Sequence, residues 1–418
     1  MFTYLRLPKG TKPSRHRPAP NSPSLMKQLS LKQMMRMTQS LKETIDHISC
    51  TPGSFALVNS TDRWPLPLST GASSDSSSCP GNSAASRAHA STSSLDRRDG
   101  TATCTGTRAR RRVHIAVLDS SFNPPTLAHQ AIAFSSFPPP TPTTTLASGP
   151  LPPRSVTGNT ADDPPQYNAR LLLFSARNVE KTLQSSDATP GQRVEMMSTL
   201  SSMRQRSNPE ESIGVGLINE PTFVGKAAIV RSYLASLPHL KGNDGEGDGH
   251  GDGEVEVDIS FLVGTDTLVR FFDPRFYPPG EMESKIAQYF APYHRQSSTS
   301  TSSNPTSRAN GQDSSLAQNQ PRLSNNGSGS GAYLVSARRG KDPSDRALEE
   351  EIINRDGISH WAQAGKVRLL GTGHEGWEEI SSTRVRKAVK LEDWDLVEKL
   401  VGKDIGAYMR SAGLYAST

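Results

Sequence analysis

The segment VHIAVLDSSFNPPTLAH, residues 113–129, decides the fold of this 418-residue chain. Apart from His114, its first six residues are apolar and partly β-branched, which predicts a buried strand. Small residues and prolines then form a turn, and helical spacing follows. Free backbone N–H groups and the helix dipole at such a turn can hold a phosphate. We therefore expect a phosphate site in which Thr126 and His129, three residues apart, face one ligand. The alternative is a capping threonine beside an exposed histidine.

Apolar runs of the same kind recur along the chain and alternate with helical patterns. The runs cover residues 170–174, 213–217, 257–263, 332–337 and 367–370. The clearest helical patterns cover residues 191–203, 222–237 and 383–399, with Pro190 and Ser382 at helix starts. This order predicts an α/β fold, in which helices cover both faces of a parallel sheet.

Composition divides the chain further. Only 33% of the residues are hydrophobic, which is low for a chain that is packed along its whole length. We expect a disordered basic tail over 1–29, a helical arm over 30–62 that can pack on the core, a low-complexity linker over 63–112 and a folded domain over 113–412. Long disordered inserts are expected in this domain at about 136–168, 241–254 and 295–330.

Several classes of protein are excluded at this stage. The three cysteines, Cys50, Cys79 and Cys104, have no metal-ligand spacing, so neither a zinc site nor a disulfide framework is indicated. No apolar stretch is long enough for a membrane helix. The basic run over residues 108–112 has no interleaved aromatic residues, so nucleic-acid binding is not expected. We expect a cytoplasmic or nuclear protein, with a mitochondrial presequence as the alternative for the basic N-terminus.

Two motifs together resemble a known family. The SSFNP turn with Thr126 and His129 is similar to the first motif of the nucleotidyltransferase superfamily, G-S-F-N-P followed by His or Thr, two residues and His. The segment ISSTRVR, residues 380–386, is similar to its second signature, I-S-S-T-x-x-R. The chain most resembles the nicotinamide mononucleotide adenylyltransferases, as a diverged member of fungal type. On physical grounds, the second signature can bind an anion, because hydroxyls and backbone N–H groups at a helix start can bind a phosphate while Arg384 and Arg386 add positive charge. The alternative is a serine-capped helix with exposed arginines.

Further segments between the two motifs resemble the family in the same order. LLLFSARNVEK (171–181) is similar to its second strand and lysine-bearing loop, and QRVEMM (192–197) to its H-R-x-x-M helix. LVGTD (262–266) is similar to its strand followed by G-x-D, and LVSARRGKD (334–342) to its strand ending in R-x-G-x-D. The resemblance covers about residues 113–412 without the inserts.

The resemblance implies a Rossmann-like, doubly wound sheet and an adenylyl transfer. The 5′-phosphate of nicotinamide mononucleotide would attack the α-phosphorus of ATP and give NAD and pyrophosphate. Mg²⁺ would bridge phosphate oxygens without direct protein ligands. The residues implied for catalysis are His129, Thr126, Arg386 and Lys181. Those implied for ATP binding are Ser121, Phe122, His129, Ser382, Thr383 and Arg386, and those for the second substrate are Gly264, Asp266, Glu220, Phe223 and Arg338.

Two departures from the family pattern keep other hypotheses open. Ser120 stands where the family has a glycine, and no tryptophan precedes Glu220. Phe223 could replace that tryptophan as a stacking surface or could belong to the core. The acceptor could therefore be another phosphate ester, such as a phosphopantetheine or phosphocholine. The chain could also be a non-catalytic, nucleotide-binding regulatory protein that binds protein partners through its disordered inserts.

Overall fold

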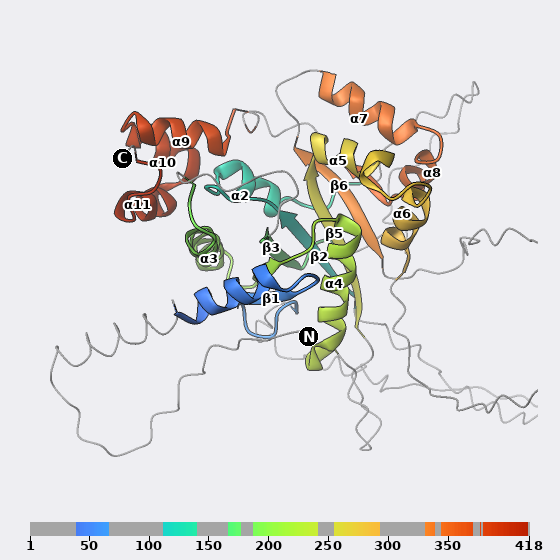
Figure 1. Ribbon diagram of the computed structural model, residues 1–418, viewed down its shortest axis with the longest axis horizontal. Coiled ribbons are helices and arrows are strands. Elements are labelled where there is room, and N and C mark those ends of the chain that lie inside the picture. Colours follow the sequence, from blue (N-terminus) through green and yellow to red (C-terminus); the bar gives the residue numbers. More distant parts are fainter. Residues whose placement is uncertain are drawn as a thin grey trace, which may run out of the picture.

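The computed structural model describes residues 39–66, 112–139, 166–176, 187–240, 255–292, 331–338, 344–370, 377 and 379–416. A seven-stranded sheet lies at the centre of the molecule (Figure 1). Its strands in spatial order are β1 (Phe55–Ser60), β4 (Ser212–Ile218), β3 (Ala169–Ser175), β2 (Arg112–Asp119), β5 (Glu256–Gly264), β6 (Ala332–Arg338) and β7 (Val367–Leu369).

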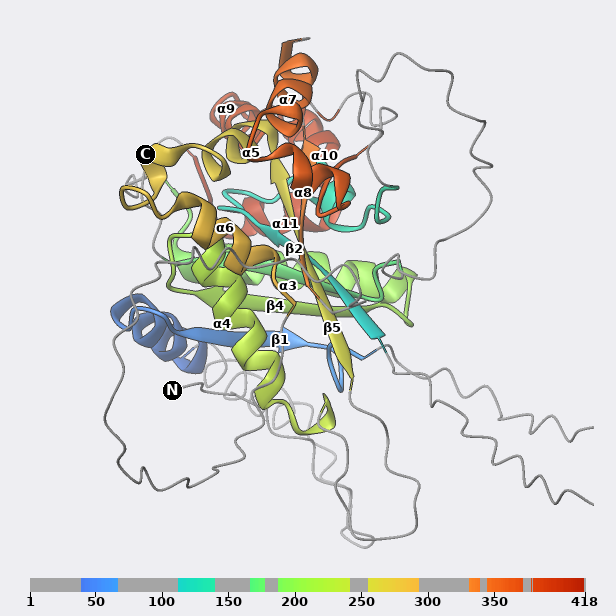
Figure 2. The same ribbon diagram turned by 90° about the vertical axis from the view of Figure 1, so that its right-hand side faces the viewer.

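The strand order defines the fold class. All pairs are parallel except β1 with β4, at one edge of the sheet. Counted from β2, the parallel strands follow the order 3-2-1-4-5-6, which is that of doubly wound dinucleotide-binding folds. The prediction of an α/β, Rossmann-like fold is therefore confirmed. Figure 2 shows the twist of the sheet, since β1 and β4 cross the view at an angle to β2 and β5.

Strands form where the sequence predicts them, and each of the six predicted runs agrees with a strand to within one residue at either end. Successive side chains of β2 point to opposite faces of the sheet. Ile115 and Val117 enter one apolar cluster, and Ala116 and Leu118 enter a second. Both faces are thus buried, which explains why most residues of these strands are apolar.

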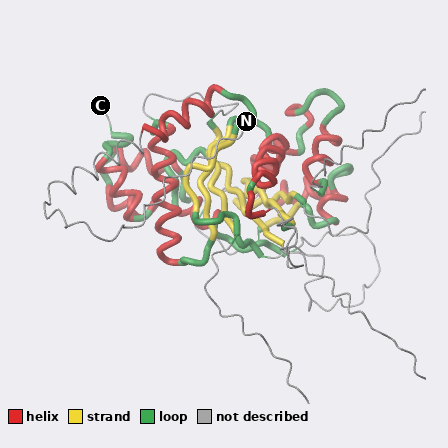
Figure 3. The backbone as a smooth tube through the Cα atoms, turned by 90° about the horizontal axis from the view of Figure 1, so that it is seen from below, coloured by secondary structure: helices red, strands yellow, loops and turns green. Residues whose placement is uncertain are grey.

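Helices cover both faces of the sheet (Figure 3). One face carries a helix over residues 39–50, α2 (Leu127–Ala133) and α3 (Pro190–Ser207), and α3 is in turn packed against α9 (Ser382–Lys390), α10 (Trp394–Val401) and α11 (Lys403–Ser411). The other carries α4 (Phe223–Ser236), α5 (Thr265–Phe271), α6 (Met282–Phe290), α7 (Ser344–Asn354) and α8 (Ser359–Gln363), with the short 3₁₀ turns η1 (Pro238–Leu240) and η2 (Pro274–Phe276). Within the described ranges, no helix combines the length and apolar character that crossing a membrane requires.

The C-terminal helical prediction is wrong in one respect. The pattern over 383–399 is divided between α9 and α10, because the chain turns at Leu391–Asp393. Glu392 has a φ of 56°, and the Asp393 side chain accepts a hydrogen bond from the Leu396 N–H at 3.0 Å. Apolar spacing continues across this break, so the periodicity alone did not reveal it.

Two sequence boundaries are also corrected. Residues 64–66, assigned to the linker, are buried: Trp64 is 2% exposed and donates from its indole N–H to the Arg170 carbonyl at 3.0 Å. The expected insert over 136–168 begins and ends within the core, since Phe137 and Tyr167 pack around the buried His114 ring. Apolar residues at the edges of low-complexity segments carried this signal.

Trp64 fixes the arm to the sheet, and its removal tests that role. A side-chain Cβ at Gly214 would lie 2.9 Å from the Trp64 ring, so the indole packs directly on the backbone of β4. Trp64→Ala should lower the free energy of unfolding by about 3–5 kcal/mol, measured by urea denaturation. The control Phe276→Ala, at a side chain that is 47% exposed, should change it by less than about 0.5 kcal/mol. Equal effects would show that the arm contributes nothing to the core.

Candidate active site

The turn after β2 and the start of α9 are joined by side-chain hydrogen bonds to backbone carbonyls. Arg386 Nη1 donates to the Asn123 carbonyl at 2.6 Å, and Ser382 Oγ donates to the Pro124 carbonyl at 2.8 Å. These partners lie 263 and 258 residues apart in the sequence. The two motifs identified in the sequence thus form a single local structure.

The Asn123 side chain is the centre of this structure. It is 7% exposed, its Nδ2 donates to Asp187 Oδ1 at 2.7 Å, and its Oδ1 accepts from the Tyr415 hydroxyl at 2.7 Å. The Ala188 N–H donates to the same Oδ1 at 3.3 Å. Burial raises the pKa of Tyr415, so its hydroxyl remains a donor near neutral pH. The turn is therefore hydrogen-bonded both to the segment just before α3 and to Tyr415, near the C-terminal end of the described chain.

Arg193 on α3 supports the same turn. Its Nε donates to the Ala188 carbonyl at 2.8 Å and its Nη1 to the Ser121 carbonyl at 3.4 Å. Its Nη2 lies 3.6 Å from Asp187 Oδ2, so both charges of this buried pair are compensated. Arg193 therefore positions the backbone of the turn.

The start of α2 is a reciprocal cap formed by Thr126 and His129. The Thr126 N–H donates to His129 Nδ1 at 3.1 Å, and the His129 N–H donates to Thr126 Oγ1 at 3.4 Å. His129 Nε2 lies 2.9 Å from Ser120 Oγ, and its ring packs against Phe122 with 5.5 Å between ring centroids. The histidine is 8% exposed, so the expectation of an exposed histidine is wrong, whereas the capping role of Thr126 is present.

The other residues predicted for ATP binding line the same turn or the start of α9. Phe122 is fully buried with a φ of 45°, so only its backbone can meet a ligand. Thr383 is exposed, and its Oγ1 accepts from Arg386 Nη2 at 3.3 Å. Ser381 caps α9 by accepting a hydrogen bond from the Arg384 N–H at 3.2 Å. The Arg384 guanidinium forms an ion pair with Glu379 at 3.1 Å. Among the described residues, no carboxylate lies within ion-pair distance of Arg386.

The residues predicted for the second substrate lie at neighbouring strand ends. The pairing of β2 with β5 ends at Leu118 and Leu262, two residues before Ser120 and Gly264. Asp266 is exposed and pairs with Arg270 at 3.3 Å. Glu220 accepts from the N–H and the hydroxyl of Thr222, at 2.9 and 2.6 Å, and so helps to cap α4.

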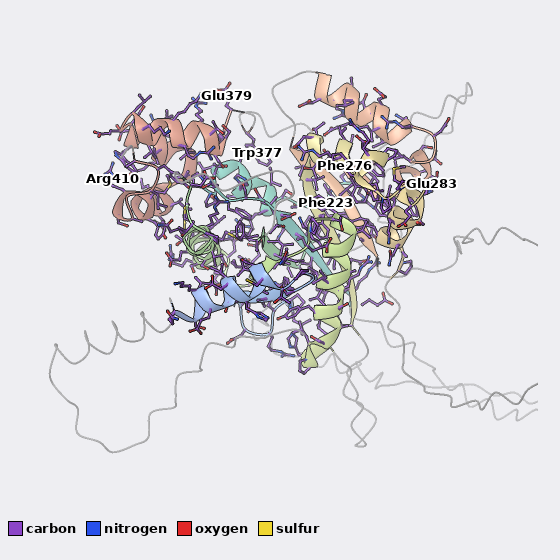
Figure 4. The ribbon with its side chains drawn as sticks, in the orientation of Figure 1. Phe223, Phe276, Glu283, Trp377, Glu379 and Arg410 are labelled. Carbon is purple, nitrogen blue, oxygen red and sulfur yellow. The ribbon has the colours of Figure 1, made fainter. Side chains whose placement is uncertain are left out.

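Phe223, at the start of α4, is partly buried and packs against the first apolar cluster (Figure 4). Its ring meets Phe261 and Phe271 edge-on, with centroids 5.5 and 6.4 Å apart. The Lys226 ammonium lies over the ring, 4.9 Å from its centroid. Trp377, on the segment that leads into α9, is partly buried against the second apolar cluster (Figure 4).

Sequence reasoning missed two polar centres at this edge of the sheet. Lys226 is 5% exposed and forms an ion pair with Asp119, whose other oxygen accepts from Ser175 Oγ at 3.0 Å. Glu349, fully buried on α7, accepts from Thr265 Oγ1 at 2.8 Å and Ser336 Oγ at 2.5 Å. A lone lysine within the apolar helix FVGKAAIV was a signal for the first centre. No sequence signal identified Asp187 or Tyr415, because their partners are distant in the chain.

Two predicted site residues remain without a structural account. Lys181 lies outside the described residues, and the Arg338 side chain does as well, although its backbone ends β6. Within the described ranges, no three His, Cys, Asp or Glu side chains are grouped so that they could hold a metal ion.

Comparisons with known proteins give similar structures only. No family model and no curated protein matches the chain. The similar structures include the Plasmodium falciparum nicotinic acid mononucleotide adenylyltransferase complexed with APC, at 12% identity and a TM-score of 0.36, covering 72% of this chain and 97% of that one. The same enzyme complexed with NaAD gives a TM-score of 0.35 at the same identity and coverage. The fold assignment rests on the strand order of the chain itself.

The Asn123 side chain should be the most sensitive polar group of the turn. Asn123→Ala leaves Asp187, Tyr415 and the Ala188 N–H without this partner, so we expect a loss of about 2–4 kcal/mol in the free energy of unfolding. Tyr415→Phe removes one hydrogen bond and should cost about 1 kcal/mol. Urea denaturation measures both. A loss in Asn123→Ala no larger than that in Tyr415→Phe would contradict the central position of Asn123.

Proposed function

We propose that the chain is a nucleotidyltransferase that transfers AMP from MgATP to nicotinamide mononucleotide, giving NAD and pyrophosphate. One observation carries the proposal: the SSFNP turn and the ISSTRVR segment, which resemble the two signatures of that family, meet through Arg386 and Ser382. They meet at the carboxyl ends of β2 and β5, where the strand order reverses and doubly wound sheets bind their ligands.

The chemistry requires no nucleophile from the protein, because the phosphate of the acceptor attacks the α-phosphorus directly. Catalysis then consists of positioning and of neutralising charge on the leaving pyrophosphate. Arg386 supplies a cation that is hydrogen-bonded to neutral oxygens in the described structure, and an incoming phosphate would add the missing anion. Thr126 holds His129 in place, and Ser382 and Thr383 line the approach to the phosphates. Mg²⁺ would arrive with ATP and be bound chiefly by phosphate oxygens and water.

The second part of the proposal concerns the molecule that accepts the AMP group. The resemblance of SSFNPPT and ISSTRVR favours an adenylyl transfer to a pyridine mononucleotide, whereas the absence of a tryptophan before Glu220 favours another phosphate ester. Purified protein with MgATP should be given nicotinamide mononucleotide, its nicotinic acid form and phosphopantetheine in parallel. Formation of NAD together with pyrophosphate supports the proposal. ATP binding without any product would support a nucleotide-binding regulatory protein instead.

His129 is the first residue to test. His129→Ala should lower kcat at least about 10²-fold, since it removes the imidazole that Thr126 and Ser120 hold at the phosphate site. His129→Asn offers Oδ1 as a substitute for Nδ1 in the Thr126 cap and therefore separates catalysis from folding. We expect low kcat in both variants, with urea midpoints for His129→Asn close to wild type. Unchanged turnover in either variant would refute the role of His129.

Arg386 is tested by nucleotide affinity. Arg386→Ala should raise the Kd for MgATP roughly 10- to 100-fold, because it removes a charge-assisted hydrogen bond to phosphate. The matched control is Arg410→Ala on α11, whose guanidinium stacks on Trp394 with 4.6 Å to the ring centroid. Isothermal titration calorimetry should show wild-type affinity in the control. Equal affinities in all three proteins would remove Arg386 from the site.

A further inference from the structure

Ser120 is held in a fixed position beside His129. Its backbone N–H donates to the Leu173 carbonyl at 3.2 Å, which continues the ladder between β2 and β3 beyond the last strand residue. Its Oγ lies 2.9 Å from His129 Nε2. Ser120 is half-buried at the carboxyl end of β2, the end of the sheet at which doubly wound folds bind their ligands.

The capping bond determines the direction of the Ser120–His129 hydrogen bond. His129 Nδ1 lies 3.1 Å from the Thr126 backbone nitrogen, which can only donate, and 2.8 Å from Thr126 Oγ1, which can donate or accept. The backbone contact favours the tautomer in which Nδ1 accepts and carries no proton. The neutral imidazole then holds its proton on Nε2 and donates it to Ser120 Oγ. This tautomer cannot take a proton from Ser120, which excludes Ser120 as a nucleophile activated by His129. The Ser120 hydroxyl proton is left to bind a different acceptor.

We propose that the Ser120 hydroxyl is itself a substrate-binding group, which donates to a phosphate oxygen of the nucleotide while His129 aligns it from behind. This inference rests on the proposed function. The family has a glycine at this position, whereas here a hydroxyl lies 2.9 Å from His129 Nε2 and adds a donor that glycine lacks. A hydrogen bond accepted from the imidazole strengthens the one that the hydroxyl donates, because successive bonds polarise one another.

Substitutions at Ser120 test whether its hydroxyl donates a hydrogen bond to phosphate or whether its side chain only hinders the approach of phosphate. If the hydroxyl binds phosphate, Ser120→Ala and Ser120→Gly should each raise the Kd for MgATP about 10-fold or more and lower kcat/KM at least as much. Ser120→Thr keeps the hydroxyl and should restore most of both. Ser236→Ala, near the end of α4, whose Oγ donates to the Tyr233 carbonyl, is the matched control and should behave as wild type. Ser120→Gly with equal or higher kcat/KM would overturn the proposal.

Two further measurements test the series of hydrogen bonds from His129 through Ser120 to the phosphate. In Ser120→Ala combined with His129→Asn, the losses in MgATP affinity should be well below additive, because both residues act on one phosphate contact. Nitrogen-15 NMR of His129 in the full chain near neutral pH should show the proton on Nε2. Additive losses, or a proton on Nδ1, would refute the series of hydrogen bonds from His129 through Ser120 to the phosphate.

The outcomes also separate this inference from the proposed function. If wild type binds MgATP but forms no NAD, while Ser120→Ala binds more weakly, the phosphate contact stands and the acceptor assignment fails. If wild type forms NAD and Ser120→Ala binds and turns over equally well, only the Ser120 inference fails. If wild type binds neither MgATP nor inorganic tripolyphosphate, both are overturned.

Discussion

Two buried carbonyls of the turn after β2 depend on side chains from the far end of the chain. The Asn123 and Pro124 carbonyls accept from Arg386 and Ser382, and a buried backbone acceptor without a partner costs about 1–3 kcal/mol. The bonds therefore favour docking of α9 onto the turn. Apolar packing of α9, α10 and α11 against Met196 of α3 adds a non-directional contribution. The polar bonds fix the register that brings the two motifs together.

The charges around this turn are distributed unequally. Arg193 is compensated by Asp187, and Lys226 by Asp119, so these two buried cations are already paired within the protein. Removing either partner of such a pair is costly, which makes these residues supports of the site and poor candidates for binding a ligand. Arg386 differs, since its described partners are a carbonyl and a hydroxyl. An anion at the turn would meet a cation that is positioned but not neutralised.

The sheet was predictable because its strands are buried on both faces, which produces apolar runs such as Leu171–Phe174. The site was partly predictable, since Thr126, His129 and Arg386 belong to segments whose residue order carries information. Contacts between segments that are distant in the sequence were not predictable. Tyr415 and Asp187 meet at Asn123 only because α3 and the C-terminal segment converge there. β1 lies within the segment predicted as a helical arm, and it joins the sheet only at its edge, antiparallel to its neighbour.

The two positions that depart from the family pattern belong to one arrangement. Ser120 follows Asp119, Asp119 forms an ion pair with Lys226, and Lys226 lies over the Phe223 ring. The ring that could have replaced the absent tryptophan therefore has a cation on one face, and Phe261 and Phe271 pack against it. That cation is fixed by the carboxylate next to Ser120. Asp119 and Lys226 thus connect the residue next to Ser120 with the Phe223 ring, so a substitution of Lys226 would remove both the ion-pair partner of Asp119 and the cation over that ring.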